Sequence, residues 1–139
     1  MTVQVAFYKG RGGWDDRIIR FVTRSPYSHC ELAIPQADGS HYCVSSHIKD
    51  GGVRGKTMRL SPDQWDILPC DVTEEAARQL LAAEQGCGYD YLGVLRFVLP
   101  FMRQSKRRWF CSELVATALG MTKPHKQTPG DVYNYLRPK

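Results

Sequence analysis

Cys111 lies where a polar, basic segment gives way to an apolar one, within Trp109 to Val115 (WFCSELV). The apolar pattern from Phe110 to Leu119, followed by Gly120, predicts a helix whose start falls at this cysteine. The positive end of a helix dipole lowers the pKa of a thiol and so favours the nucleophilic thiolate. The backbone N–H groups of the first turn lack intrahelical acceptors and can donate to an oxyanion. Cys111 is therefore a candidate nucleophile, although a cysteine packed in a core gives the same pattern.

His29 is the candidate base for this thiol. The segment from His29 to Ile34 alternates like a strand, with His29 and Glu31 on the same face. Two residues along a strand span roughly 6.6 Å, which lets a long carboxylate approach the imidazole ring. A carboxylate in this place orients the ring and stabilises its charged form. The residues therefore predict a catalytic set with Cys111 as nucleophile, His29 as base and Glu31 as the third member.

The third position has alternatives on the next predicted strand, namely Ser45, Ser46, His47 and His41. A turn centred between residues 37 and 38 would set Ser46 opposite His29. A one-residue bulge would bring Ser45 or His47 there instead, and a tighter turn would bring His41. A serine is a poor substitute for a carboxylate or an imidazole in this role, so Glu31 is the favoured residue and the others remain its alternatives.

Two aromatic residues near the predicted nucleophile and base are candidates for the oxyanion donor or the wall of a cleft. Tyr27 precedes His29 by two residues, and its hydroxyl could donate to an oxyanion. Trp109 precedes Cys111 by two residues. Packing in the core or at the rim of the site is the competing interpretation for both side chains.

The elements that must hold these residues begin with a strand at Val3 to Tyr8 and a helix at Trp14 to Thr23. The middle of the chain reads as an antiparallel meander with glycine-containing turns at residues 38–39 and 50–52. Its strands are predicted at His29 to Ile34, His41 to His47, Val53 to Leu60 and Trp65 to Cys70.

Helices are predicted to follow the meander. The first is capped by Thr73 and runs to about Glu84, and the second covers Tyr91 to Phe101. The helix of Cys111 comes next, and a short final element runs from Thr128 to Leu136. This order predicts an α+β fold in which an antiparallel sheet of about four to five strands packs against helices. The length of 139 residues corresponds to a single domain over 1–139.

With these landmarks the sequence resembles the circularly permuted papain-like hydrolases. It is similar to the NlpC-related branch that includes YiiX-like proteins and lecithin:retinol acyltransferase-like enzymes. In that branch the histidine comes first on a strand and the cysteine comes late at a helix start, as Ser28-His29 and Cys111-Ser112-Glu113-Leu114-Val115 do here. Tyr89-Asp90-Tyr91-Leu92-Gly93 also resembles the family. The resemblance spans roughly residues 5 to 135, and its specific motifs are short.

A narrower resemblance is to small phage-encoded or bacterial members, through His29-x-Glu31-Leu32, Ser45-Ser46 and Asp50-Gly51-Gly52-Val53-Arg54. The resemblance implies a thiol-dependent hydrolase, a peptidase or amidase that works through an acyl-enzyme, with peptidoglycan peptides as a natural substrate class. A lipid or ester acyltransferase or thioesterase on the same scaffold is the alternative activity. No cofactor and no metal are expected.

Composition limits the class of protein, the kinds of metal site and the cellular location to expect. The chain is 42% hydrophobic and 24% charged, as in globular proteins. The odd number of cysteines at irregular spacing, with no C-x-x-C pair, argues against a zinc ribbon. The sequence shows neither a signal peptide nor an apolar run long enough for a membrane span. We therefore expect reduced thiols and a cytoplasmic location, which is the host cytoplasm if the protein is phage-encoded.

The net charge of +5 is partly local, because a basic cluster lies just before the predicted nucleophile. The cluster consists of Arg103, Lys106, Arg107 and Arg108. It is either a solvated loop or a patch for an anionic partner, and no nucleic-acid motif accompanies it. A non-enzymatic binding module that uses this cluster is thus a second hypothesis. A metal site built on Cys111 and His29 is a third, disfavoured by the lack of closely spaced ligand pairs.

Overall fold

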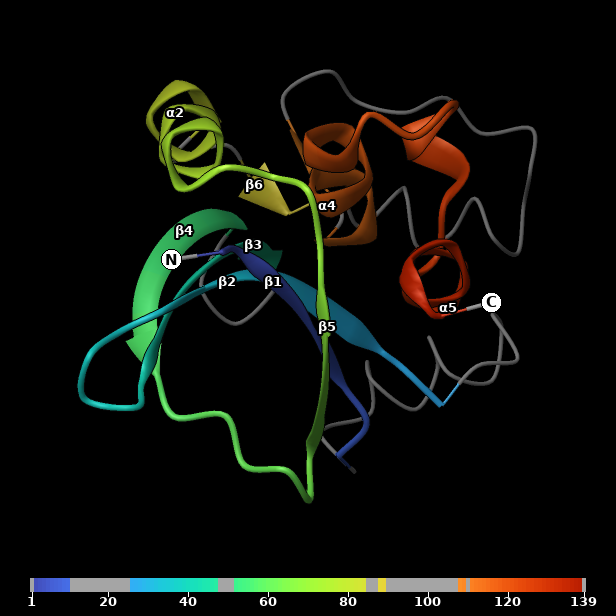
Figure 1. Ribbon diagram of the computed structural model, residues 1–139. Helices are drawn as coiled ribbons and strands as arrows, with labels where there is room; N and C mark the ends of the chain where they lie inside the picture. The colour runs from blue at the N-terminus through green and yellow to red at the C-terminus, as the bar shows by residue number, and fades with distance from the viewer. Residues whose placement is uncertain are drawn as a thin grey trace.

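The computed structural model describes residues 2–10, 26–47, 52–84, 88–89, 108–109 and 111–138. The strands are β1 (Gln4–Tyr8), β2 (His29–Pro35), β3 (His41–His47), β4 (Gly52–Met58), β5 (Trp65–Pro69), β6 (Gly88–Tyr89) and β7 (Arg108–Trp109). The helices are α2 (Glu74–Glu84), α4 (Cys111–Leu119), the 3₁₀ turn η2 (Pro124–Lys126) and α5 (Pro129–Leu136). The α+β class is therefore confirmed (Figure 1).

An antiparallel five-stranded sheet forms the centre, with strand order β4-β3-β2-β1-β5. The hairpins β2–β3 and β3–β4 confirm the predicted meander over those three strands. The predicted continuation into the next strand is wrong, because β5 pairs antiparallel with β1 at the opposite edge. The period-2 pattern of a strand records which face is buried, but it does not record which sheet edge the strand joins.

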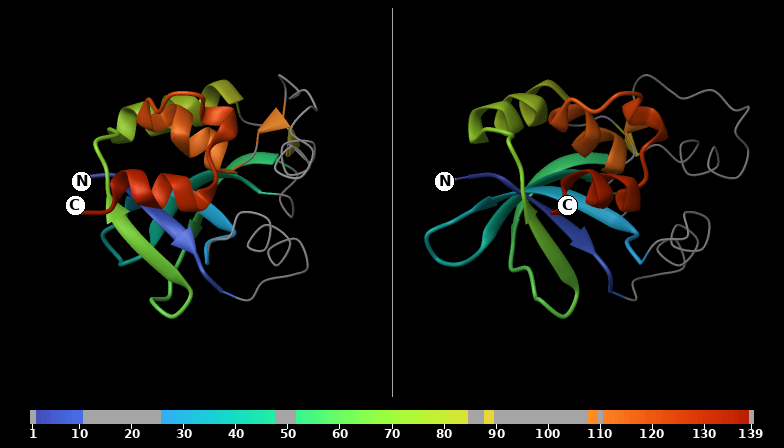
Figure 2. Two further views of the ribbon diagram at one scale, coloured as in Figure 1. Left: turned by 90° about the vertical axis from the view of Figure 1, so that its right-hand side faces the viewer. Right: turned by 45° about the vertical axis from the view of Figure 1, so that its right-hand side comes forward.

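The helices cover one face of this sheet, as both views of Figure 2 show. Alternate strand residues such as Val5, Leu32 and Val44 are fully buried there against Leu114 of α4 and Val132 of α5. The other face carries small buried residues, Ala6, Ala33 and Cys43, packed with partly buried side chains from β4, β5 and the loop between them. The strand alternation in the sequence thus separates the face that packs against the helices from a second face with a smaller apolar cluster.

Two helices begin with side-chain caps, of which the sequence predicts the one at Thr73. Thr73 Oγ1 accepts a hydrogen bond of 3.0 Å from the backbone N–H of Ala76 in α2. At α5, Thr128 and Asp131 form a reciprocal capping box. These local bonds define where each helix begins and therefore how its first turn meets the sheet.

Some predicted features lie outside the described residues, namely the helix at 14–23, the helix at 91–101 and the basic residues Arg103, Lys106 and Arg107. Arg108 and Trp109 form β7, which pairs in parallel with β6 through Gly88↔Arg108 and Tyr89↔Trp109. Within the described ranges, no helix is long and apolar enough to cross a membrane.

Candidate active site

Helix α4 begins at Cys111 and packs its first turns against β2. The Cys111 side chain is almost completely buried, with 1% of the residue exposed. It interacts with His29 through charge and a hydrogen bond, and it also receives hydrogen bonds from the thiol and the backbone of Cys30. The structure therefore brings together the cysteine and the histidine that the sequence singles out, although they are 82 positions apart in the sequence.

The pKa of the Cys111 thiol is low. Burial by itself would raise this pKa, but the Cys30 hydrogen bonds and the positive charge of His29 lower it to about 5. Burial and the neighbouring Cys111 keep the pKa of Cys30 well above its ordinary value, so the Cys30 thiol stays protonated and remains a donor. At neutral pH this arrangement favours a Cys111 thiolate, the form that attacks carbonyl groups.

His29 is held from both sides of its ring. Its Nε2 lies 2.8 Å from Oε2 of Glu31, which leaves Nδ1 as the ring nitrogen for the thiol. Burial would lower the pKa of His29, but the charges and hydrogen bonds of Cys111 and Glu31 raise it to about 9. Cys111 and His29 therefore form a thiolate–imidazolium pair over the pH range between the two pKa values.

Glu31 lies beside His29, in the place that the strand spacing predicts, and it is 1% exposed. Arg54 on β4 donates two hydrogen bonds to this carboxylate. Its Nη1 bonds to Oε1, and its Nη2 bonds to Oε2 at 2.6 Å. Burial would raise the pKa of Glu31, but its bonds to Arg54 and His29 lower that pKa to about 2. The carboxylate is thus ionised at every pH where the thiolate exists.

Ser45 explains how Arg54 reaches Glu31 from two strands away. It pairs with Arg54 across β3 and β4, and the β2–β3 register places it level with Glu31. Its side chain is small, and its Oγ donates a 2.7 Å hydrogen bond to the carbonyl of Cys30. The long Arg54 side chain can therefore pass over this strand to the carboxylate.

The register corrects the expectation that Ser46 faces His29. Leu32 pairs with Val44, so the turn is centred on residue 38 rather than between residues 37 and 38. Extended along both strands, this register sets His47, not Ser46, opposite His29. Ser46 alternates with Ser45 and therefore belongs to the other face of β3. The His47 side chain lies outside the described part of the chain.

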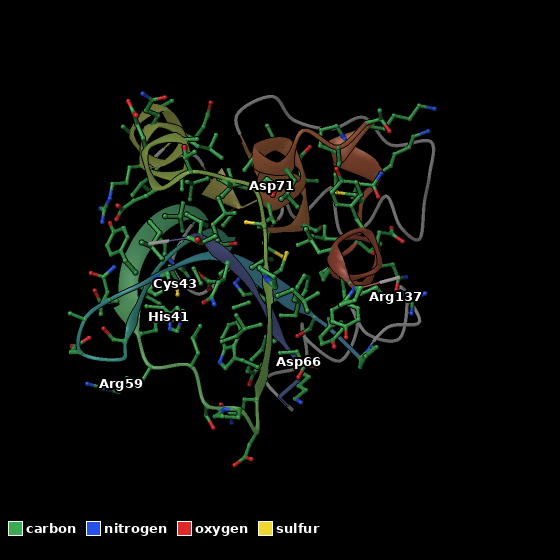
Figure 3. All side chains as sticks on the ribbon, in the orientation of Figure 1. His41, Cys43, Arg59, Asp66, Asp71 and Arg137 are labelled. Atoms are coloured by element: carbon green, nitrogen blue, oxygen red, sulfur yellow. The ribbon has the colours of Figure 1, made fainter. Side chains whose placement is uncertain are left out.

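His41 lies away from the site, at the opposite end of the β2–β3 hairpin. It pairs with Pro35 at the end of β2, and its Nε2 lies 3.0 Å from Oε1 of Gln4. Figure 3 shows His41 and Cys43 together on the sheet side of the molecule, away from α4. These contacts leave no place for His41 beside His29.

Tyr27, just before β2, links this strand to β5. Its hydroxyl donates a 2.5 Å hydrogen bond to Oδ2 of Asp66, which also binds Lys9 at 2.8 Å. Its ring packs against Phe7 and Tyr133. Burial and the Asp66 bond raise the pKa of the Tyr27 hydroxyl, so its proton is directed to β5 in this structure. The Trp109 side chain lies outside the described residues.

Sequence reasoning missed two neighbours of the site, Arg54 and Trp65. The Trp65 ring meets His29 edge-on at a centroid distance of 6.4 Å, from the strand that joins the sheet at β1. Arg54 belongs to the glycine-containing segment that resembles phage-encoded members, but the sequence pattern of a strand does not show which carboxylate an arginine will bind. Only the strand order places either side chain near the histidine.

Glu31 links the stability of the fold to acid pH. Its pKa falls from 4.5 to about 2 in the folded protein. Such a group contributes stability above its unfolded pKa and loses that contribution as the pH falls through its folded pKa. We expect the free energy of unfolding, measured by urea denaturation, to decline between about pH 4.5 and pH 2. The Glu31→Gln variant should decline less steeply there; an equal slope would contradict this linkage.

Among the described residues, no group of three or more His, Cys, Asp or Glu side chains is placed to hold a metal ion. The Glu31 carboxylate lies beside His29, and Arg54 and His29 occupy both of its oxygens. The arrangement can serve as a nucleophile with its base.

No protein-family model matches this sequence, and no curated protein matches it either. The fold does match solved structures, among them the crystal structure of the metalloprotein yiiX from Escherichia coli O157:H7. The TM-score is 0.53 at 20% sequence identity, over 87% of this chain and 67% of that chain. At this identity the likeness is one of fold. The chain therefore has a yiiX-like α+β fold, as the resemblance to YiiX-like papain-like proteins predicts.

Proposed function

We propose that the protein is a thiol-dependent hydrolase of the peptidase or amidase type. One observation carries the proposal, the buried Cys111 at the start of α4 in charge contact with His29, whose other ring nitrogen is bound to Glu31. This arrangement supplies a nucleophile, a base and an orienting carboxylate in their required order. The yiiX-like fold is consistent with a papain-like hydrolase.

In the proposed reaction the Cys111 thiolate attacks the carbonyl carbon of an amide. The first-turn N–H groups of α4 are suited to donate to the oxyanion, because they have no acceptor within the helix. The His29 imidazolium gives its proton to the leaving amine as the C–N bond breaks, and an acyl-enzyme forms on Sγ. His29 then takes a proton from water, the hydroxide attacks the thioester, and release of the carboxylic acid restores the Cys111 thiolate and the His29 imidazolium. Glu31 holds the ring in orientation throughout.

The first test is whether Cys111 is the activated thiol. We expect iodoacetamide to modify Cys111 ahead of Cys30, Cys43 and Cys70 at pH 6, as measured by mass spectrometry of peptides from briefly treated protein. The pKa of Cys111 is lowered to about 5, whereas those of Cys30, Cys43 and Cys70 are raised. The rate at Cys111 should rise through about pH 5 and then level off. Labelling of Cys111 no faster than Cys30, Cys43 and Cys70 would refute the proposal.

The second test concerns the substrate class. Peptides released from bacterial cell walls are the proposed substrates, and chromatography with mass spectrometry would detect newly formed amino groups and carboxylates. An acyl ester or thioester offered in the same assay separates a peptidase from a thioesterase or acyltransferase. Turnover of esters alone would replace the amidase assignment. Tight, salt-sensitive binding with no turnover of either class would favour a binding module.

A further inference from the structure

Arg54 is a nearly buried cation that the thiol reaction does not itself require. Only 12% of its side chain is exposed, and it reaches across β3 to take both oxygens of Glu31. Desolvating a guanidinium is costly unless its charge is matched. A salt bridge on the surface would add stability with less desolvation, so the place of this one, on the carboxylate that binds His29, points to a role in the site.

We propose that Arg54 is a positioning residue that keeps Cys111 in its thiolate form, acting through Glu31 and His29. The inference rests on the proposed function, because it takes Cys111 as the nucleophile. Arg54 does not touch the thiol. It lies two contacts away, joined by the Arg54–Glu31 pair and the 2.8 Å Glu31–His29 bond.

The argument depends on the alternation of charge along this row. Thiolate, imidazolium, carboxylate and guanidinium follow one another, so each buried charge has an opposite neighbour. Removing the Arg54 charge leaves two anions, Cys111 and Glu31, competing for the single cation of His29. A buried site relieves such an excess by taking up a proton.

The proton should go to the thiolate rather than to the carboxylate. An ordinary thiol has a pKa near 8.5 and an ordinary glutamate one near 4.3, a difference of about four pH units in favour of protonating sulfur. Loss of Arg54 should therefore raise the pKa of Cys111 and turn a reactive thiolate into a thiol. The His29–Glu31 pair would stay an imidazolium beside a carboxylate.

The other titratable groups around the row are the same in all four proteins, so the variants differ only at residues 31 and 54. They are Tyr8 on β1, Cys30 on β2, Cys43 on β3, Lys56 on β4, Asp66 on β5 and Glu113 on α4. The His47 side chain, on the strand beside His29, lies outside the described residues and is likewise unchanged in every variant.

The experiment measures the rate of iodoacetamide labelling at Cys111 against pH in four proteins. The acid limb is the range of pH over which the labelling rate of Cys111 rises as the thiol ionises. In Arg54→Met this limb should move up by at least about one pH unit, so that at acid pH the labelling rate falls about tenfold. Arg54→Lys keeps the charge and should keep the limb near its wild-type position. The double variant Glu31→Gln/Arg54→Met removes one anion and one cation together, and its limb should return toward wild type.

A purely structural role predicts a different pattern. Arg54→Met would then lose stability in urea denaturation while every folded sample kept the wild-type limb, and that result would overturn the inference. If Arg54→Met does not fold, a double variant whose limb stays well above wild type would overturn it instead. Failure of the proposed function is separate, because it would appear in the wild-type protein as a Cys111 with no low-pH limb.

Discussion

The Cys111→Ala variant is expected to hydrolyse a substrate of the wild-type protein roughly three to six powers of ten more slowly, because it lacks the sulfur atom that forms the acyl-enzyme. The change should leave the fold in place. Cys111 occupies the first turn of α4 beside β2, and alanine keeps the helix start and removes one sulfur atom from the core. The measurement is the initial rate on a peptide substrate, with near-ultraviolet circular dichroism as the check on folding.

Cys70→Ala is the matched control for this variant. Cys70 is also a buried cysteine, 7% exposed, and its thiol donates a hydrogen bond to the carbonyl of Val3, the residue before β1. The control removes the same atom from a similar environment outside the site, so its rate should stay within about twofold of wild type. Equal losses in the two variants would assign the effect to packing, and an active Cys111→Ala would exclude this residue as nucleophile.

The Glu31→Ala variant is expected to be destabilised by about 3–5 kcal/mol, the usual cost of removing one partner from a buried ion pair. Without this carboxylate the cations of Arg54 and His29 face each other in a site where their side chains are only 12% and 6% exposed. The alanine also leaves a small cavity beside Ala6, its partner on β1. Urea denaturation at pH 7 measures the loss.

Glu74→Gln provides the contrast for this measurement. Glu74 pairs with Arg78 at 3.2 Å on the surface of α2, where both side chains are about half exposed. An exposed pair one helical turn apart contributes less than about 0.5 kcal/mol, because water and salt screen it. If Glu31→Ala costs no more than Glu74→Gln, then the buried row of charges is not what holds β2, β3 and β4 together at the site.

The strongest sequence inferences were those that depend on local physics. A thiol at the start of an apolar helix, and a carboxylate two residues from a histidine on one strand, are relations that chain geometry dictates at short range. The structure places both as predicted, with α4 starting at Cys111 and Glu31 bonded to Nε2 of His29. Helix bounds, caps and strand faces were predictable for the same reason.

The weaker inferences were those that depend on which segments meet. The predicted register missed by one residue, because a hairpin loop of a given length permits more than one turn and each shift moves every side chain to the other face. The edge that β5 joins was wrong, and with it the place of Trp65 beside His29. Arg54 stayed without a role until β3 and β4 were aligned.

The sequence by itself determined the chemical types at this site and the local elements that carry them: Cys111 on a helix start, and His29 with Glu31 on a strand face. Only the tertiary structure decided that the thiol meets the imidazole and that Arg54 crosses Ser45 to complete the row of charges. The physical reason is range. Backbone geometry governs contacts a few residues apart, whereas the pKa values that make a thiol reactive come from burial and from charges brought together by packing.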